Sequence, residues 1–191
     1  NKKFYFNEIP CVPDGEFIDE IHKKWFKNYE KLESHHGYIQ WLFPIREQGM
    51  NYHASPLQVH EAEAIKNNEE AKKRVLTSYR LMLDFYGIKL ANEKTGKVSR
   101  ASNWIERYYH LNRSFHNYLR ITRILKSLGE LGYEHLKAPL VMLLLEEAVE
   151  HKTLKNIERS CCEYFVYTLR HEEERVDVIN WIKQFSKYGV R

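Results

Sequence analysis

Two carboxylate–histidine pairs at helical spacing are the residues of this chain that come nearest to a metal site. Glu33 and His36 have the Glu-x-x-His spacing of di-iron helical bundles, and Asp19 stands at the same offset from His22. A di-iron centre needs a second complete pair and two more glutamates facing the same interior, which this pattern does not supply. The chain also lacks C-x-x-C and H-E-x-x-H motifs. We therefore expect these side chains to be exposed polar groups on helices, and we expect the chain to bind no metal and no cofactor.

The cysteines are the next candidates for chemistry, and they are Cys11 and the adjacent Cys161 and Cys162. Either of the adjacent thiols could act with a distant histidine, but a helix interior is a poor place for an attacking thiolate. Nucleophile-elbow, phosphate-loop and dinucleotide motifs are missing from the sequence. We therefore expect a protein that is not an enzyme. The odd number of cysteines argues against a disulfide framework and favours a reducing compartment.

A basic stripe is expected on the helix that follows Leu111. At about 100° per residue, one side of this helix carries Arg113, His116, Arg120, Arg123 and Ser127. The opposite side is apolar and expected to lie in the core: Phe115, Tyr118, Leu119, Thr122, Leu125 and Leu128. Arginine binds carboxylates and phosphates in bidentate fashion, so the stripe could hold phosphate, an acidic peptide or a terminal carboxylate. We favour a solvated face that pairs with glutamates, because most charge runs are solvated surface.

The stretch SHHGYIQWLFPIREQGMNYH, residues 34–53, brings aromatic rings next to a charged loop. Pro44 is expected to end the preceding helix, because proline pushes the residue before it out of helical geometry. Arg46 and Glu47 then fall in a loop after Trp41, and such a loop is where a ligand would bind. In the alternative interpretation the rings fill a corner of the core while Arg46 bonds helix-end carbonyls. We favour the core for the rings and leave both interpretations open for Arg46.

Apolar periodicity predicts an all-α chain, a single globular domain of about eight helices. The expected helices include residues 16–26, 29–42, 68–86, 112–132, 140–151 and 157–174. Helix 140–151 is apolar over most of its circumference and is therefore expected to be central. The turn at Lys94-Thr95-Gly96 predicts a short hairpin near residues 88–99. A length of 191 residues suits one domain or a tight pair of subdomains.

Charge and apolar content limit the partners. Lys+Arg 30 stands beside Asp+Glu 26, and the net charge of +4 permits acidic partners without demanding nucleic acid. The longest apolar run, residues 138–145, is too short for membrane insertion. Because the chain starts at Asn1 without a leader, we expect residues 1–191 to be an excised domain of a longer protein.

Several long strings resemble one known family. HHGYIQWLFPIREQGMNYHASPLQVHEAEAI, LMLDFYGIKL, LNRSFHNYLRITRILKSLGELG and APLVMLLLEE are similar to the conserved region of the opioid growth factor receptor family, and so is the upstream IPCVPDGEFIDEIHKKWF. The resemblance covers nearly the whole chain. It implies an intracellular receptor-type protein of the nucleus and perinuclear cytoplasm that binds the pentapeptide Met-enkephalin and restrains cell growth. It also implies no relation to seven-helix opioid receptors, and it leaves receptor or receptor-like paralogue open.

The chemistry of Met-enkephalin suggests which residues would bind it, since the peptide has an ammonium, two rings, a methionine and a carboxylate. A pocket for it needs an acidic group, ring-lined walls and an arginine. Our candidates are Arg46 or Arg120 for the carboxylate, Tyr38, Trp41 and Trp104 for the walls, and Glu47 for the ammonium. One alternative is a nucleic-acid or phosphoprotein module that uses the basic stripe. Others are a protein-docking domain without a small ligand and, third, a diiron or zinc enzyme.

Overall fold

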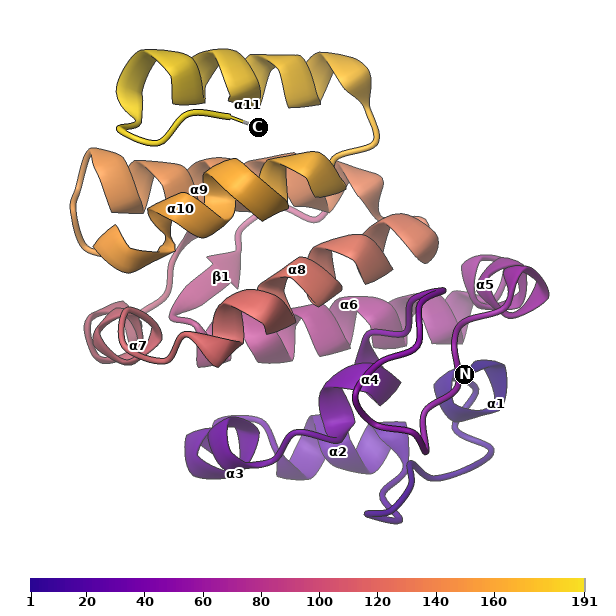
Figure 1. The fold of residues 1–191 in the computed structure, drawn as a ribbon. Helices are drawn as coiled ribbons and strands as arrows, with labels where there is room; N and C mark the ends of the chain where they lie inside the picture. Colours follow the sequence, from indigo (N-terminus) through magenta and orange to yellow (C-terminus); the bar gives the residue numbers. More distant parts are fainter. Residues whose placement is uncertain (191) are drawn as a thin grey trace. The chain divides into compact units, whose positions relative to one another are not determined.

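The computed structural model describes residues 1–190. The backbone divides into two compact units, one of residues 1–85 with 130–132 and the other of residues 86–129 with 133 onward. The described residues contain eleven α-helices and one two-stranded sheet (Figure 1), and eight of these helices have six residues or more. The expected all-α class, about eight helices and the hairpin near residues 88–99 are therefore confirmed. None of the helices in residues 1–190 is long and apolar enough to cross a bilayer.

The first unit is built on its longest helix, α6. Its helices are α1 (Lys2–Tyr5), α2 (Ile18–Lys24), α3 (Tyr29–Ser34), α4 (Tyr38–Leu42), α5 (Val59–Lys66) and α6 (Glu69–Phe85). Helices α2 and α5 pack against α6, and α1 contacts both α5 and α6 (Figure 1). Asn68 caps α6 by accepting a hydrogen bond from the Ala71 N–H, and two glutamates in its first turn favour the helix dipole.

The expected helix 29–42 is broken in two, which is a correction to the sequence prediction. His35 is extended, with ψ 134°, and Gly37 opens α4. The side chain of His35 bonds Asp14 at 2.6 Å and its ring lies 5.3 Å from that of Trp25. The contact joins the break between α3 and α4 to the segment before α2, which begins only at Ile18. Pro44 ends the second half as predicted, because α4 stops at Leu42.

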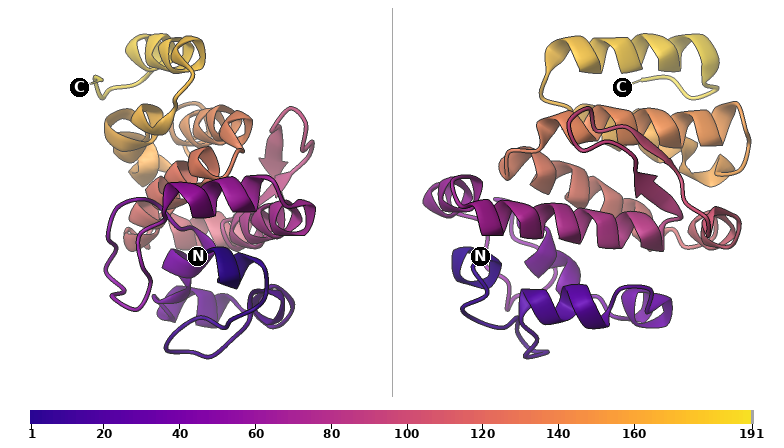
Figure 2. Two further views of the ribbon diagram at one scale, coloured as in Figure 1. Left: turned by 90° about the vertical axis from the view of Figure 1, so that its right-hand side faces the viewer. Right: turned by 180° about the vertical axis from the view of Figure 1, so that it is seen from behind.

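The second unit is organised around α9, which is central as its sequence predicted. Its elements are β1 (Ile88–Leu90), β2 (Val98–Arg100), α7 (Trp104–Leu111), α8 (His116–Glu130), α9 (Lys137–Val149), α10 (Glu158–Ser160), a π-turn (Cys161–Phe165) and α11 (Glu172–Phe185). The strands pair antiparallel with Ile88 opposite Arg100. Helix α9 contacts β2, α10 and α11, and Figure 2 shows the hairpin lying across α9.

Several boundaries differ from the expected ones in the second unit, and two of the differences have a clear physical cause. Helix α9 starts at Lys137, two residues before Pro139, because a proline in the first turn removes an N–H that has no helical partner anyway. The expected helix 157–174 ends by Thr168, and the acidic run Glu172–Glu174 instead opens α11. Carboxylates are favourable at a helix N-terminus and unfavourable at a C-terminus, so the run belongs to the following helix.

The core side of α8 also differs from the prediction. Phe115 and Leu119, expected in the core, are 60% and 76% exposed, whereas Arg120 is only 7% exposed. The buried row follows i, i+3, i+4 and i+7 spacing through Ile121 and Ile124, and Arg120 shares that row. The basic stripe is therefore not one continuous solvated face.

Candidate functional site

The charged loop of the first unit, residues 46–52, is held in place by the buried side chain of Gln40. The side-chain oxygen of Gln40 accepts a hydrogen bond from the Asn51 N–H at 2.7 Å, and Gln40 is only 9% exposed. Gly49 passes so close that a Cβ there would lie 2.6 Å from the Gln40 amide. The Leu57 N–H closes the base of the loop by donating to the Ile45 carbonyl at 2.8 Å. This framework gives residues 46–52 a defined path.

Arg46 and Glu47 are both exposed on this loop, as the sequence predicted for a bend after Pro44. The Arg46 side chain is 51% exposed, and its Nε donates to the Glu130 carboxylate at 2.9 Å. Two apolar side chains on the same loop are almost fully exposed, Met50 at 89% and Tyr52 at 88%. Arg46 thus bonds a carboxylate rather than the helix-end carbonyls of the alternative interpretation.

The two candidate wall rings of the first unit lie in its core. Tyr38 is completely buried and donates from its hydroxyl to the Leu32 carbonyl at 2.8 Å. Trp41 is 7% exposed, and its Nε1 donates to the Val12 carbonyl at 3.1 Å. This placement agrees with the core interpretation that we favoured for the rings.

Trp104 and Arg120 belong to the second unit. Trp104 is half-buried, with the Arg100 guanidinium 4.0 Å from its ring centre. The Arg120 side chain donates to the Asn117 side-chain oxygen at 3.3 Å and is largely closed to solvent. The other stripe residues differ in exposure, since Arg113 and His116 are exposed while Arg123 is half-buried.

The pair at Asp19 and His22 has other partners. Both oxygens of Asp19 bond Arg74, at 2.7 and 3.0 Å, which lowers the pKa of the carboxyl. His22 Nε2 lies 2.8 Å from the Ser78 hydroxyl, and burial lowers the pKa of His22 to about 4. They border an open hollow of about 440 Å³, in which Asp19 pairs with Arg74 and Glu70 with Lys73. Residues 1–190 contain no group of three or more side chains able to hold a metal ion.

The cysteines are buried in the described structure. Burial raises the pKa of Cys11, Cys161 and Cys162, and for Cys161 it does so strongly. A thiol whose pKa is raised stays protonated at neutral pH, so it is a poor nucleophile. These thiols serve as core side chains.

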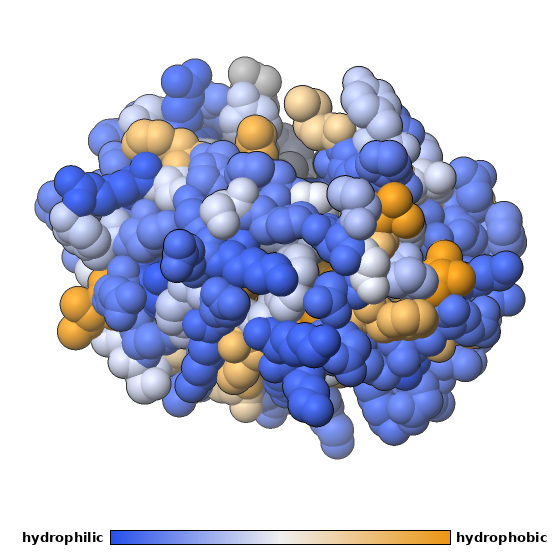
Figure 3. Space-filling model, turned by 90° about the horizontal axis from the view of Figure 1, so that it is seen from below, coloured by the Kyte–Doolittle hydropathy of each residue, from blue (hydrophilic) through white to orange (hydrophobic). Residues whose placement is uncertain are grey.

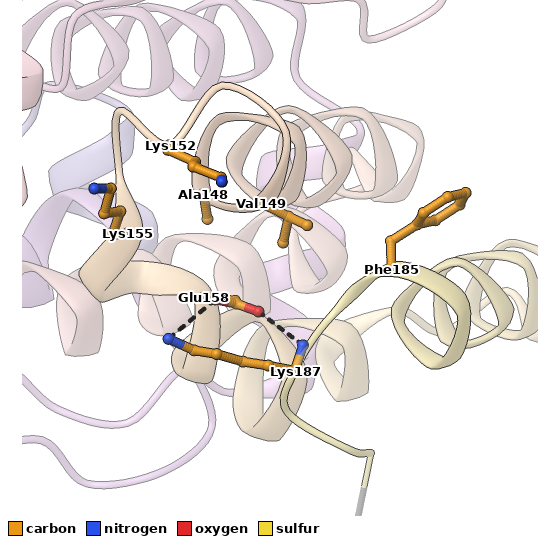
Figure 4. A pocket seen from close by; sticks show the side chains of 7 residues that line it. All are labelled: Ala148, Val149, Lys152, Lys155, Glu158, Phe185 and Lys187. Atoms are coloured by element: carbon orange, nitrogen blue, oxygen red, sulfur yellow. Dashed lines mark hydrogen bonds and ion pairs between the residues drawn. The ribbon is translucent and has the colours of Figure 1, made fainter.

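A hollow of about 240 Å³ in the second unit went unnoticed in the sequence. It is lined by Ala148, Val149, Lys152, Lys155, Glu158, Phe185 and Lys187. In Figure 4 the two small apolar side chains point from the end of α9 toward Glu158 and Lys187, with the two-lysine turn on one side and Phe185 on the other. In Figure 4 the Lys152 side chain extends over Ala148, the Lys155 side chain lies at the outer edge, and Lys187 pairs with Glu158. Lysines beside an apolar floor suit a ligand that is both anionic and apolar.

The lysine-bearing turn after α9 is fixed by one buried carboxylate, Glu147. Arg100 donates to both oxygens of Glu147 at 2.6 Å, and the Thr153 hydroxyl donates to one of them at 2.6 Å. The Thr153 and Leu154 N–H groups donate to the Glu147 carbonyl. Burial acts to raise the pKa of Glu147, but these hydrogen bonds outweigh burial and lower it. Glu147 is therefore ionised at neutral pH, and it ties the turn to the hairpin.

No motif marks this hollow in the sequence, because its lining combines residues 148–158 with the separate segment 185–187. The one local signal is the run His151-Lys152-Thr153-Leu154-Lys155 directly after a long apolar helix. Basic residues after a helix end are common, since they favour the helix dipole. Only the return of residues 186–187 onto Glu158 reveals that the lysines surround a cavity.

Comparison with known proteins identifies the relatives of this chain. The family model for the opioid growth factor receptor conserved region matches residues 1–189. Opioid growth factor receptor-like protein 1 of Mus musculus is 55% identical over 184 residues, which are 96% of this chain and 39% of that protein. The protein of the same name in Xenopus tropicalis is 56% identical over 175 residues, 92% of this chain and 34% of the relative. Opioid growth factor receptor of Homo sapiens is 48% identical over 181 residues, 95% of this chain and 27% of the relative.

The chain thus spans 27 to 39% of the length of these relatives. No solved structure matches it significantly. The family model extends over residues of both units, and the relatives align over more than nine tenths of the chain. The resemblance seen in the sequence is confirmed, and the chain belongs to the opioid growth factor receptor family.

Proposed function

We propose that this chain is the ligand-recognition region of a non-enzymatic intracellular receptor that binds Met-enkephalin, the opioid growth factor, and restrains cell growth. We place the whole protein in the nucleus and the perinuclear cytoplasm. The observation that carries the proposal is the alignment with Opioid growth factor receptor of Homo sapiens at 48% identity over 95% of this chain. Because the match covers nearly the whole chain, we infer that this chain shares a ligand with that relative as well as a fold.

The exposed loop of the first unit offers groups that fit the two ends of a peptide. Arg46 is one candidate partner for the carboxylate, because its bond to Glu130 is partly exposed and such ion pairs contribute at most about 1 kcal/mol. Glu47 is exposed on the same loop and could face an ammonium group. A flexible pentapeptide loses conformational entropy on binding, so we expect modest affinity for the isolated chain.

Calorimetric titration of the purified chain with Met-enkephalin tests the proposal. We expect one-to-one binding that a peptide of the same composition in scrambled order does not reproduce. Absence of both heat and NMR shift changes at millimolar peptide would refute ligand recognition by this region. Imaging of the full-length protein tests the proposed localisation, and an exclusively extranuclear distribution would contradict it.

A second candidate function is the docking of a protein partner without a small ligand. Four apolar side chains on and beside α7 and α8 are 60 to 76% exposed: Ile105, Tyr109, Phe115 and Leu119. Ile105 and Tyr109 are four residues apart, as are Phe115 and Leu119, so each pair adjoins on the helix surface, and adjoining exposed apolar side chains often mark protein contacts. The face drawn in Figure 3 is mainly hydrophilic, with apolar side chains scattered over it. A Leu119→Lys variant that loses a cellular partner yet still binds the peptide would favour docking.

The nucleic-acid or phosphoprotein alternative is less well supported. It needs a continuous basic face, and the burial of Arg120 interrupts that face. Binding of this kind should weaken steeply with salt, so titrations of DNA, RNA and phosphopeptides at two salt concentrations would detect it.

A further inference from the structure

We propose that the hollow of the second unit binds the C-terminal residue of a peptide. The lysines take the terminal carboxylate, while Ala148 and Val149 contact an apolar last side chain. The assignment deepens the proposed function and rests on it for the class of ligand. Three features of the hollow support the assignment: its charges, its apolar floor and its size.

The charges around the hollow leave two ammonium groups available. Within residues 1–190 neither Lys152 nor Lys155 has an ion-pair partner, and both are exposed. Glu158 is the one carboxylate among the lining residues, and it is already engaged. One of its oxygens accepts from the Ser186 hydroxyl at 2.8 Å and the Lys187 N–H at 3.2 Å, and the other lies 3.9 Å from the Lys187 ammonium. An incoming carboxylate would therefore meet a surplus of positive charge.

The size of the hollow decides between a peptide end and a longer anion. About 240 Å³ lies below the 300 to 1,000 Å³ usual for pockets that enclose drug-sized ligands. The hollow therefore suits one side chain with its carboxylate, while the rest of a peptide extends into solvent. A long acyl chain would remain mostly exposed to water, which opposes its binding. Phe185, 47% exposed at the edge, offers a ring against the penultimate residue.

The lysine-bearing turn is pre-organised. Lys152 adopts the left-handed conformation, with φ 57°, which is unfavourable for residues other than glycine. The Thr153 hydroxyl bonds the carbonyl oxygen and the carboxylate of Glu147, and these contacts hold the turn in this shape. Figure 4 shows the path of the turn. A turn that is already shaped loses little entropy when it binds a ligand.

This conformation permits variants that separate binding from folding. Lys152→Gly removes the ammonium and relieves the backbone, so we expect the thermal midpoint to rise by about 2 to 4 °C while binding weakens. Lys155→Gln removes the second charge with little change in volume. Lys27→Gly is the matched control, because Lys27 is also left-handed, with φ 64°, and belongs to the first unit.

The test is NMR titration of the chain with N-acetyl-alanyl-phenylalanine as the free acid and as the amide. We expect the acid to shift the signals of Ala148 and Val149 and to bind about tenfold more tightly than the amide. The Lys152→Gly, Lys155→Gln double variant should weaken acid binding about fivefold or more, and Lys27→Gly should leave it unchanged. Equal binding of acid and amide, no binding at millimolar acid, or shifts confined to other residues would overturn the proposal. Preference for octanoate over the peptide acid would overturn it too.

The same variants separate this site from the proposed function. If the dipeptide acid binds at the hollow but Met-enkephalin does not bind the chain, the site stands and the opioid ligand fails. If Met-enkephalin binds and the lysine variants leave its affinity unchanged, the receptor function stands and the site is refuted. Weakening by Arg46→Ala alone would place the carboxylate on the loop of the first unit and would also refute the site.

Discussion

His22 should make the chain lose stability between neutral and mildly acidic pH. Burial lowers its pKa from 6.5 to about 4, with Arg74 acting in the same direction and Asp19 opposing. Its stabilising contribution is fully present above pH 6.5, where the ring is neutral in both the folded and unfolded chain, and falls as the pH drops toward 4. The difference of the two pKa values corresponds to about 3 kcal/mol at most.

Replacement of His22 by glutamine should remove this dependence while an amide stays within reach of the Ser78 hydroxyl. Urea unfolding at several pH values between about 7.5 and 4 would measure it. We expect the wild-type chain to lose about 3 kcal/mol more of its unfolding free energy than His22→Gln over this range. The exposed His60, replaced by glutamine, serves as the control and should follow the wild type. Parallel decline of wild type and His22→Gln would refute the reasoning.

Three further changes test the packing. Gly49→Ala should lower the unfolding free energy by about 1 kcal/mol, because its Cβ would lie 2.6 Å from Gln40; Gly189→Ala, with no atom within 4 Å, should have no effect in the same urea titration. Glu147→Gln should lower stability by about 2 kcal/mol in chemical unfolding, since it leaves a partly buried guanidinium without its charge partner; an unchanged midpoint would contradict this. Leu144→Ala in the centre of α9 should cost about 2 to 5 kcal/mol by calorimetry, and a loss below 1 kcal/mol would show that α9 is not central.

Local patterns were sufficient to predict the elements that depend on nearest neighbours. Pro44 ends a helix by a steric clash with the residue before it, and Gly96 in the hairpin turn has a φ of 75°. The apolar circumference of α9 indicated a central helix, and α9 does contact β2, α10 and α11. One side of it stays half-buried, formed by Pro139, Met142, Leu143, Glu146 and Val149. Such features need no knowledge of the partner element.

The orientation of α8 could not be obtained in the same way. Its sequence has apolar residues on more than one side, so two different rows could face the core. The exposed Leu119 and the buried Arg120 are neighbours in sequence, and the choice between their rows depends on what surrounds the helix. Burial of an arginine requires hydrogen-bond partners from the fold, and Asn117 is one such partner.

The candidate site shows the same limit. The exposed position of Arg46 followed from one proline, but its partner Glu130 lies 84 residues away in sequence. The lysine-lined hollow exists because the segment after α11 returns to Glu158, 28 residues earlier than Ser186. Contacts of this kind are properties of the folded chain, so neither residue spacing nor composition predicts them.

Competition for the ligand carboxylate favours the lysines over Arg46. At Arg46 a carboxylate must displace Glu130, which the chain holds 2.9 Å away and which acts as a ligand of high effective concentration. At Lys152 and Lys155 there is no such competitor among residues 1–190. Arginine forms the stronger bidentate pair with a carboxylate. However, a ligand that replaces Glu130 gains only the difference between the free energies of the new and the old ion pair. The Glu130→Gln variant tests this argument, because it removes the competing charge. If peptide binding in this variant depended more on Arg46 than on the two lysines, competition from Glu130 would explain why the carboxylate does not bind the loop in the wild type.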